Sequence, residues 1–227
     1  MATQTCPLRP AARPPGWWVA CALLAGMLAA LAAPAPAQAL ENATLLQQLA
    51  QGNAQDRRNA LLRLADQGDF ATVPWVAAAL SDEDAVARKL AEQALWAIWS
   101  RSGDEEVDAL LRQGTHLLNR GQPGASVAVF TQIIERAPDF AEGWNKRATA
   151  YYHIGQYEKS LLDIDETLKR NPFHFGALSG AGLCLVELGR DAEALAYFDR
   201  ALAINPNLAG ILELKEQVAR RARRPLV

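Results

Sequence analysis

The sequence predicts an all-α protein, a right-handed α-solenoid built from helix-turn-helix repeats. Half of the 227 residues are hydrophobic. Alanine and leucine dominate while β-branched residues are few, and this composition favours helices over strands. Three prolines, Pro138, Pro172 and Pro206, recur every 34 residues. A fixed period of this length indicates helical hairpins that stack on one another.

The first 39 residues predict a secretory signal peptide. Arg9 and Arg13 precede a nearly continuous apolar run at 17–33, and Ala37-Gln38-Ala39 then supplies small residues at a cleavage site. Cleavage after Ala39 exports the mature chain, and the alanine-rich signal is typical of bacteria, which indicates the periplasm. The alternative is an uncleaved anchor, because the apolar run approaches the length that spans a bilayer.

Cleavage has two consequences for the mature chain. Cys184 is then the one remaining cysteine, so an intramolecular disulfide cannot form. Loss of Arg9 and Arg13 lowers the formal net charge from -2 to -4. An acidic chain gives no electrostatic reason to expect a nucleic-acid partner, and contact with a membrane is expected only if the N-terminal segment stays uncleaved.

Each repeat reads as two helices with a tight turn between them. In the unit at 141–174 the helices are expected at 141–154 and 157–170, with Gly155 in a left-handed turn conformation. A small residue at Gly114, Ala148 and Gly182 lets the two helices of each hairpin approach closely. Proline then stops the second helix and starts the next unit.

These columns resemble the tetratricopeptide repeat. The resemblance covers three units, at 107–140, 141–174 and 175–208. The second and third units match the family's positions with Trp144, Ala148, Tyr151, Ser160 and Pro172, and with Gly182, Ala194, Phe198, Ala201 and Pro206. The first unit departs most, with Leu110, Leu117 and the turn 122–124. Residues 209–227 are expected to form a capping helix and tail that cover the last apolar face.

The segment 40–103 is also expected to be helical. Within it, 69–102 resembles one HEAT-type repeat: Pro74 lies near the start of its first helix, and the acidic turn Ser81-Asp82-Glu83-Asp84 caps the second. An ordinary helical hairpin remains the alternative. In either case the segment is expected to stack on the first tetratricopeptide unit and extend the solenoid.

The resemblance implies a binding surface on the concave side, formed by the first helix of each unit. The residues that it places there are Leu111, Thr115, Leu118, Asn119, Glu142, Asn145, Thr149, Tyr152, His153, Ser179, Leu183, Val186 and Glu187. This mixed apolar and hydrogen-bonding surface suits an extended segment or a helix of a partner protein. The predicted function is therefore a non-catalytic adaptor or scaffold. A membrane-tethered assembly or regulatory subunit with an uncleaved anchor is the alternative.

The sequence offers no catalytic, cofactor or metal site. It lacks a Gly-rich phosphate loop and a Gly-x-Ser-x-Gly elbow, and no two histidines share a helical turn. His116, His153 and His174 are expected on the surface or in the groove, and Cys184 is expected to be a buried thiol. Trp96 and Trp99 are expected to pack between the two kinds of repeat.

Overall fold

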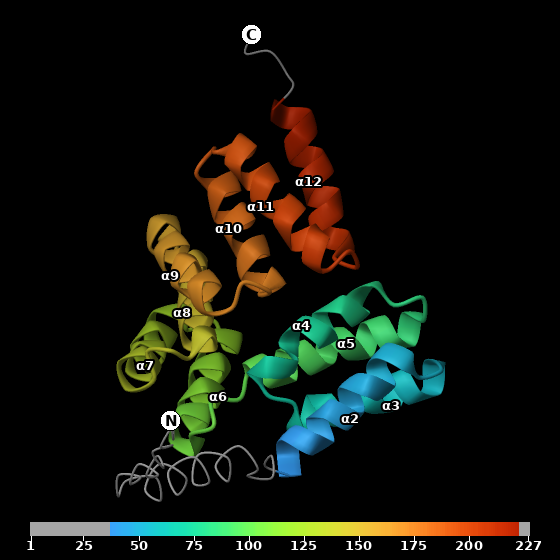
Figure 1. Cartoon of the computed structure of the whole chain (residues 1–227). Helices are drawn as coiled ribbons and strands as arrows, with labels where there is room; N and C mark the ends of the chain where they lie inside the picture. The colour runs from blue at the N-terminus through green and yellow to red at the C-terminus, as the bar shows by residue number, and fades with distance from the viewer. Residues whose placement is uncertain (1–36, 223–227) are drawn as a thin grey trace, which may run out of the picture. The chain divides into compact units, whose positions relative to one another are not determined.

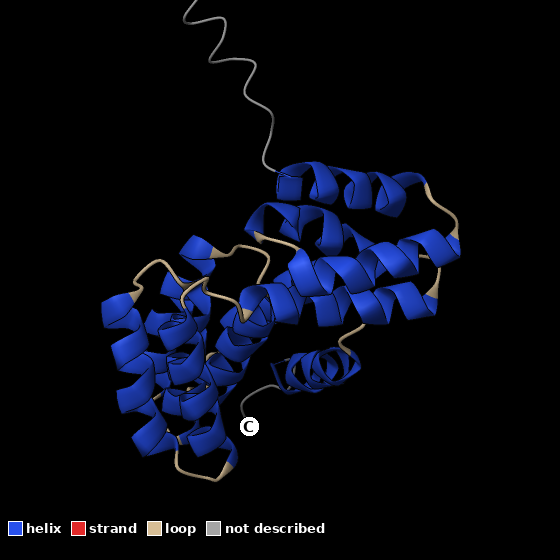
Figure 2. Ribbon diagram, turned by 90° about the horizontal axis from the view of Figure 1, so that it is seen from below, coloured by secondary structure: helices blue, strands red, loops and turns tan. Residues whose placement is uncertain are grey.

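The computed structural model describes residues 37–222, and every regular element in this part of the chain is a helix (Figures 1 and 2). The N-terminal segment consists of α2 (Ala37–Gln51), α3 (Ala54–Gln67), the short turn η1 (Phe70–Thr72), α4 (Val73–Ala78), the short turn η2 (Ala79–Ser81) and α5 (Ala85–Trp99). From Glu41 onward the described residues form one compact unit.

Seven helices follow, and from α6 to α12 each packs on the next one along the chain. They are α6 (Glu105–Asn119), α7 (Pro123–Arg136), α8 (Ala141–His153), α9 (Tyr157–Arg170), α10 (Phe175–Glu187), α11 (Asp191–Ile204) and α12 (Ala209–Ala222). The turns inside the hairpins place Gly121, Gly155 and Gly189 at φ values of 72°, 72° and 71°. The left-handed turn predicted at Gly155 is thereby confirmed, and the other two hairpins repeat it.

The predicted small residues lie at the closest approach of each hairpin. A Cβ added to Gly114 would stand 2.3 Å from a ring carbon of Phe130, and one added to Gly182 would stand 2.3 Å from the same ring carbon of Phe198. The second unit has Ala148 at this position and the smaller Ile164 opposite, both buried in one apolar cluster. The hairpins thus use two combinations of similar total volume: glycine with phenylalanine, and alanine with isoleucine.

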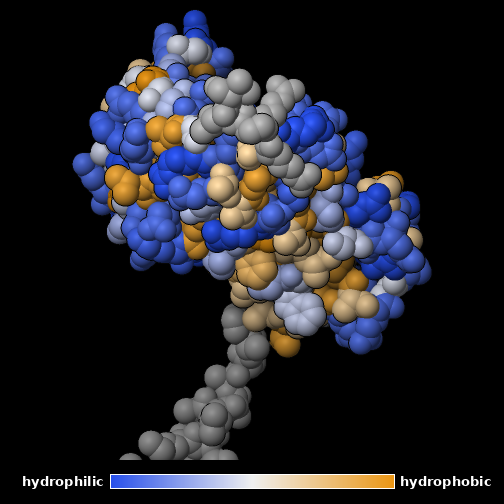
Figure 3. Space-filling view, turned by 90° about the horizontal axis from the view of Figure 1, so that it is seen from above, coloured by the Kyte–Doolittle hydropathy of each residue, from blue (hydrophilic) through white to orange (hydrophobic). Residues whose placement is uncertain are grey.

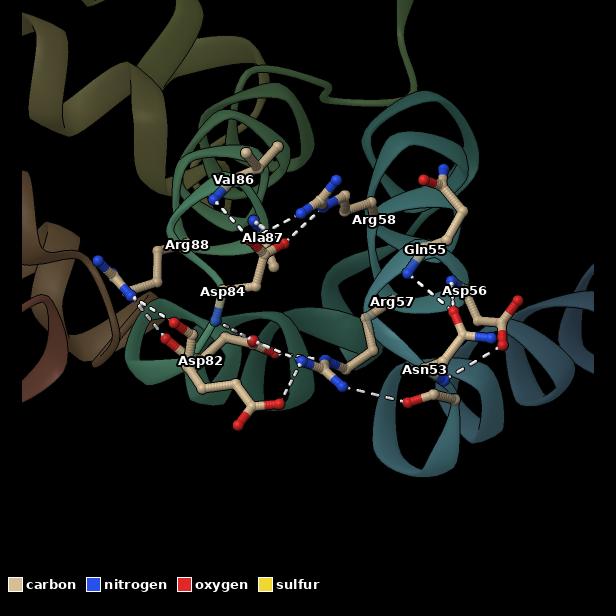
Figure 4. Close-up of polar contacts among 12 residues, drawn as sticks. Asn53, Gln55, Asp56, Arg57, Arg58, Asp82, Asp84, Val86, Ala87 and Arg88 are labelled. Carbon is tan, nitrogen blue, oxygen red and sulfur yellow. Dashed lines mark hydrogen bonds and ion pairs between the residues drawn. The ribbon is translucent and has the colours of Figure 1, made fainter.

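The two helices α3 and α5 are joined by arginine–aspartate pairs (Figure 4). Arg57 donates to both carboxylate oxygens of Asp82 at 2.7 and 2.9 Å, and Arg58 donates to both oxygens of Asp84 at 2.5 and 2.8 Å. Asp84 also accepts from the backbone N–H groups of Val86 and Ala87 and so caps α5, as the acidic turn predicts. These pairs fix the acidic turn before α5 against the first turn of α3.

The N-terminal segment makes its main side-chain contacts with the third repeat unit, and the expected stacking on the first unit is not what the structure shows. The segment's apolar core includes Phe175 of α10, and Ile204 and Leu208 pack against that core. The reason is the aromatic content of α5, since Trp96 and Trp99 reach the start of α10. In Figure 1, α4 and α5 accordingly lie below the end of the α10–α11 hairpin at which α10 begins and α11 ends.

At the other end, α12 covers the last hairpin. Its buried Val218 belongs to one apolar cluster with Leu185 and Phe198. Cys184 is buried as predicted, and its Sγ donates to the Ser160 hydroxyl at 3.2 Å.

The predicted signal peptide lies almost wholly outside the described residues, which begin at Ala37. None of the helices described combines the length and the hydropathy needed to cross a bilayer.

Candidate functional site

The first helices of the three units lie side by side, since α6 contacts α8 and α8 contacts α10. We call the surface that they form, which the family resemblance assigns to the concave side, the inner face. A cavity of about 510 Å³ opens on this face beside the first unit. Its lining residues are Ser100, Arg101, Asp108, Leu111, Arg112, Thr115, His116, Asn119 and Lys146.

Helix α6 forms one wall of this cavity. Leu111, Thr115 and Asn119 are spaced four residues apart, so their side chains follow one another along a single stripe of the helix. Leu111 is one of the buried residues of this helix, with Val107 and Gly114, whereas Thr115 is half-buried and Asn119 is exposed. The structure therefore brings together three of the predicted groove residues in the cavity, and their spacing is the reason.

The cavity lining carries three cationic side chains and one carboxylate. The Lys146 ammonium lies 3.2 Å from a carboxylate oxygen of the buried Glu142. The Arg112 guanidinium lies 2.8 Å from a carboxylate oxygen of the exposed Glu105. Arg101 donates to two backbone carbonyl groups of the N-terminal segment. The carboxylate of Asp108 accepts from the backbone N–H and the hydroxyl of Ser102. A cationic lining in an acidic chain favours a ligand that brings a carboxylate or carbonyl oxygens.

Sequence reasoning missed several of these lining residues. Arg112 and Lys146 occupy the sixth position of their units, so a charged residue recurs there in two successive units. This repetition was a signal that could have identified them. Ser100 and Arg101 lie before the first unit, and no repeat pattern places them at the site.

Other predicted groove residues do not line the cavity and form hydrogen bonds within their own helices. The Thr149 hydroxyl donates to the Asn145 carbonyl at 2.9 Å, and the Ser179 hydroxyl donates to the Phe175 carbonyl at 2.8 Å. Asn145 itself is buried, and its amide donates to Glu142 at 3.1 Å. The cavity lining therefore includes only part of the predicted set. Leu111, although it lines the cavity, is also largely buried.

Most of the remaining predicted residues lie in the second halves of α8 and α10, and Leu118 lies in the last turn of α6. The Tyr152 ring lies 5.6 Å from that of Tyr157 and 5.8 Å from that of His153. Burial and the nearby charge of Glu187 raise the pKa of Tyr152. Leu118, Leu183 and Val186 are half-buried, whereas His153 and Glu187 are exposed. None of these residues lines the cavity, and Tyr152 with His153 and Glu187 forms a small aromatic and acidic group away from it.

The prediction of a surface or groove histidine is wrong for His174, which is fully buried. Its Nδ1 accepts from the Ala177 N–H at 3.0 Å, so the ring proton lies on Nε2 and is donated to Glu142 at 3.0 Å. Because both ring nitrogens have partners, the side chain can be buried. Burial opposes ionisation of Glu142, but the hydrogen bond from His174 and the charge of Lys146 outweigh it and hold the pKa of this carboxyl below its usual range.

Exposed apolar side chains do not mark a second site. Trp75 and Phe70 on the N-terminal segment are 54% and 50% exposed, and Leu162 on α9 is 70% exposed. Figure 3 shows orange apolar side chains dispersed among blue polar ones on the face seen from above. Single exposed apolar residues are normal on protein surfaces.

The fold defines a helical-repeat protein whose first helices lie side by side on one face. Comparison with known families makes this more specific, because the tetratricopeptide repeat model matches residues 111–164 and 154–209. This part of the chain therefore consists of tetratricopeptide repeats.

Two curated relatives share these repeats. A TPR repeat-containing protein of Rhizobium etli is 35% identical over 108 residues, which is 48% of this chain and 53% of that protein. Human tetratricopeptide repeat protein 4 is 27% identical over 119 residues, 51% of this chain and 31% of that protein. The chain thus spans about half the length of the first relative and less than a third of the second.

A solved structure with the same fold is the first tetratricopeptide domain of Spaghetti (RPAP3), bound to an HSP90 peptide. It superposes with a TM-score of 0.51 at 18% sequence identity and covers 52% of this chain and 96% of that chain. Since identity is this low, the likeness shows the fold alone.

Proposed function

We propose that the chain is a non-catalytic adaptor whose inner face binds a short segment of another protein. The observation that carries this proposal is the cavity of about 510 Å³ between α6, α8 and the connection from α5 to α6. Cavities of a few hundred Å³ accommodate small ligands or a few side chains. A solved tetratricopeptide domain is described with a bound HSP90 peptide, which supports a peptide ligand for this fold.

The segment bound in the cavity carries an acidic side chain or exposed carbonyl groups. Lys146 and Arg112 supply cationic groups, and Thr115 and Asn119 supply hydrogen-bonding groups beside them. Charged hydrogen bonds to a carboxylate of the bound segment would fix the orientation of that segment. The side chain of Leu111 would contact an apolar part of the same segment.

The proposal also includes export to the bacterial periplasm after cleavage behind Ala39, and a HEAT-like segment at residues 40–103. Support comes from the order of basic, apolar and small residues at 1–39 and from the capped hairpin of α4 and α5. N-terminal sequencing of the mature protein tests the first point. A mature chain that begins at Leu40 supports export with cleavage, and an intact Met1 or Ala2 would favour the anchored alternative.

The test of binding compares two tryptophan substitutions in the full chain. Thr115→Trp fills the cavity, whereas Leu162→Trp adds the same side chain at a position that is 70% exposed on α9. Affinity capture from an extract of the source cells, followed by mass spectrometry, identifies what each chain retains. A partner kept by the parent and by Leu162→Trp, but lost by Thr115→Trp, supports the proposal. Equal retention by both variants would place the binding surface elsewhere.

A further inference from the structure

Two tryptophans of α5 lie against the beginnings of α8 and α10. The Trp96 ring makes edge contacts with His174 and Phe175, each with 5.4 Å between ring centroids. The Lys146 ammonium lies 6.0 Å from the centroid of the same indole. A Cβ added to Gly176 would stand 2.6 Å from Trp96 Cη2, so the indole fills space that any other residue at 176 would occupy.

Trp99 provides the second contact, one helical turn further on. Its ring stacks on that of His174 with centroids 4.4 Å apart and planes inclined by 20°. It also lies 5.2 Å from the ring of Phe175, which is 1% exposed. Trp96 and Trp99 are three residues apart and therefore project from the same face of α5.

A polar contact holds the segment at a further point. The Asn207 amide donates to the Leu80 carbonyl at 2.7 Å, and the Arg88 guanidinium donates to the Asn207 side-chain oxygen at 3.1 Å. Together with the two tryptophans, these bonds dock the N-terminal segment on the third unit.

Part of the surface that α5 covers belongs to the inner face, since Trp96 meets Gly176. Gly176 and Glu142 are the second residues of their units, a position that the family resemblance assigns to the concave side. An amphipathic helix that places apolar anchors in a groove is a recurring mode of peptide recognition. The contacts of α5 with α8 and α10 have this form, except that the helix and the groove belong to one chain.

We propose that α5 is a resident ligand of the inner face, and that the surface between α8 and α10 is shaped for a helix with two aromatic side chains three residues apart. The proposal rests on the proposed function in one respect, that the inner face is the surface where partners bind. Gly176 provides the seat for the first aromatic ring, and the buried pair of His174 and Glu142 provides the flat support for the second.

This arrangement determines which partners can bind. A tethered helix has an effective concentration in the millimolar range, so a free helix of similar affinity cannot displace it. A partner therefore reaches the cavity beside the first unit without hindrance. A partner helix with paired aromatic residues reaches α8 and α10 only after α5 has left.

The chain's own helix supplies the probe for a test. A fluorescent peptide with the sequence of residues 84–101 is titrated with the full chain, and binding is measured by fluorescence anisotropy. The parent chain is expected to show no binding up to a concentration at which the Trp96→Ala, Trp99→Ala chain is saturated, a difference of tenfold or more. A peptide with both tryptophans replaced by alanine is expected to bind neither chain.

A third variant tests whether the peptide binds at the space next to Gly176. Gly176→Leu, added to the double variant, fills the space left by the Trp96 indole and is expected to reverse the gain in peptide affinity. Leu162→Trp, added instead, changes a position on α9 that is 70% exposed and is expected to leave peptide binding unchanged. The result is independent of whether the cavity binds a partner, and failure of one proposal can be told from failure of the other.

Two outcomes would overturn the proposal. One is equal peptide binding by the parent and the double variant. The other is absence of binding to a double variant that keeps the parent's circular dichroism at 222 nm. Trp99 also packs in the core of the N-terminal segment. If the double variant loses helicity, Trp96→Ala alone replaces it, because the Trp96 ring lies at the margin of that core and is half-buried.

Discussion

The contact between Gly182 and Phe198 gives a prediction in which one substitution changes sign with its background. A methyl group at position 182 would stand 2.3 Å from the phenylalanine ring. Overpacking of this kind costs about 1–3 kcal/mol. Alanine in a helix interior is in turn about 1 kcal/mol more favourable than glycine. We therefore expect Gly182→Ala to destabilise the chain by about 0–2 kcal/mol.

The same substitution is expected to stabilise a chain that already carries Phe198→Ile. Removal of the ring recreates the combination of Ala148 with Ile164 that the second unit uses. The overpacking then disappears and the helix-propensity gain of about 1 kcal/mol remains. The coupling between the two substitutions is thus about 1–3 kcal/mol, within the range found for residues in direct contact.

Urea denaturation followed by circular dichroism at 222 nm measures this coupling in the four chains of the cycle. With a slope of roughly 2 kcal/mol per molar urea, a coupling of 2 kcal/mol moves the midpoint by about 1 M. Gly180→Ala is the control in the same helix, since its Cβ would meet Ile164 at an ordinary 3.5 Å. A Gly182→Ala effect of equal size and sign in both backgrounds would refute the proposed volume compensation.

Three further predictions follow from buried or capping groups. Because the pKa of Glu142 is lowered in the folded chain, its contribution to stability is present above the ordinary value of 4.5 and is lost as the pH falls below it; urea midpoints at pH 7 and pH 3.5 should therefore differ more for the parent than for Glu142→Gln. Asp84→Ala removes the cap of α5 and the partner of Arg58, so it should lower the urea midpoint more than Asp84→Asn, which keeps a capping oxygen. Cys184 is buried and its thiol pKa is raised by that burial, so a thiol reagent at pH 8 should label it slowly in buffer and rapidly in urea; fast labelling of the folded chain would contradict the packing described.

The hairpin boundaries could be predicted because local residues set them. Gly155 takes a positive φ that other residues adopt reluctantly, and Pro172 cannot continue a helix, so both mark the chain wherever they occur. The second helix of the middle unit accordingly runs from Tyr157 to Arg170, as the spacing predicts. The structure ends its first helix at His153, one residue before the expected end.

The interior of the inner face could not be predicted in the same way. The repeat pattern places the side chain of Glu142 outward, yet His174, which lies 32 residues further along the chain, makes its burial possible. Likewise, the space above Gly176 is filled by Trp96, a residue outside the repeats, so the repeat pattern could not predict this contact. The contact between Trp96 and Gly176 forms only when the N-terminal segment docks on the third unit. The 34-residue period of the repeats does not predict that docking.

The hydrogen bond from Asn207 to Leu80 joins residues 127 positions apart. In a simple repeat array each unit touches its neighbours alone, so folding can begin anywhere and the ends unfold independently. Here the last hairpin completes its contacts only with a segment made at the start of synthesis. The entropy cost of closing so long a loop must be met before its contacts can stabilise the chain. Docking of the N-terminal segment is therefore expected to be the late, slow step in folding. Once it has occurred, the third unit can no longer unravel without exposing the tryptophans of α5.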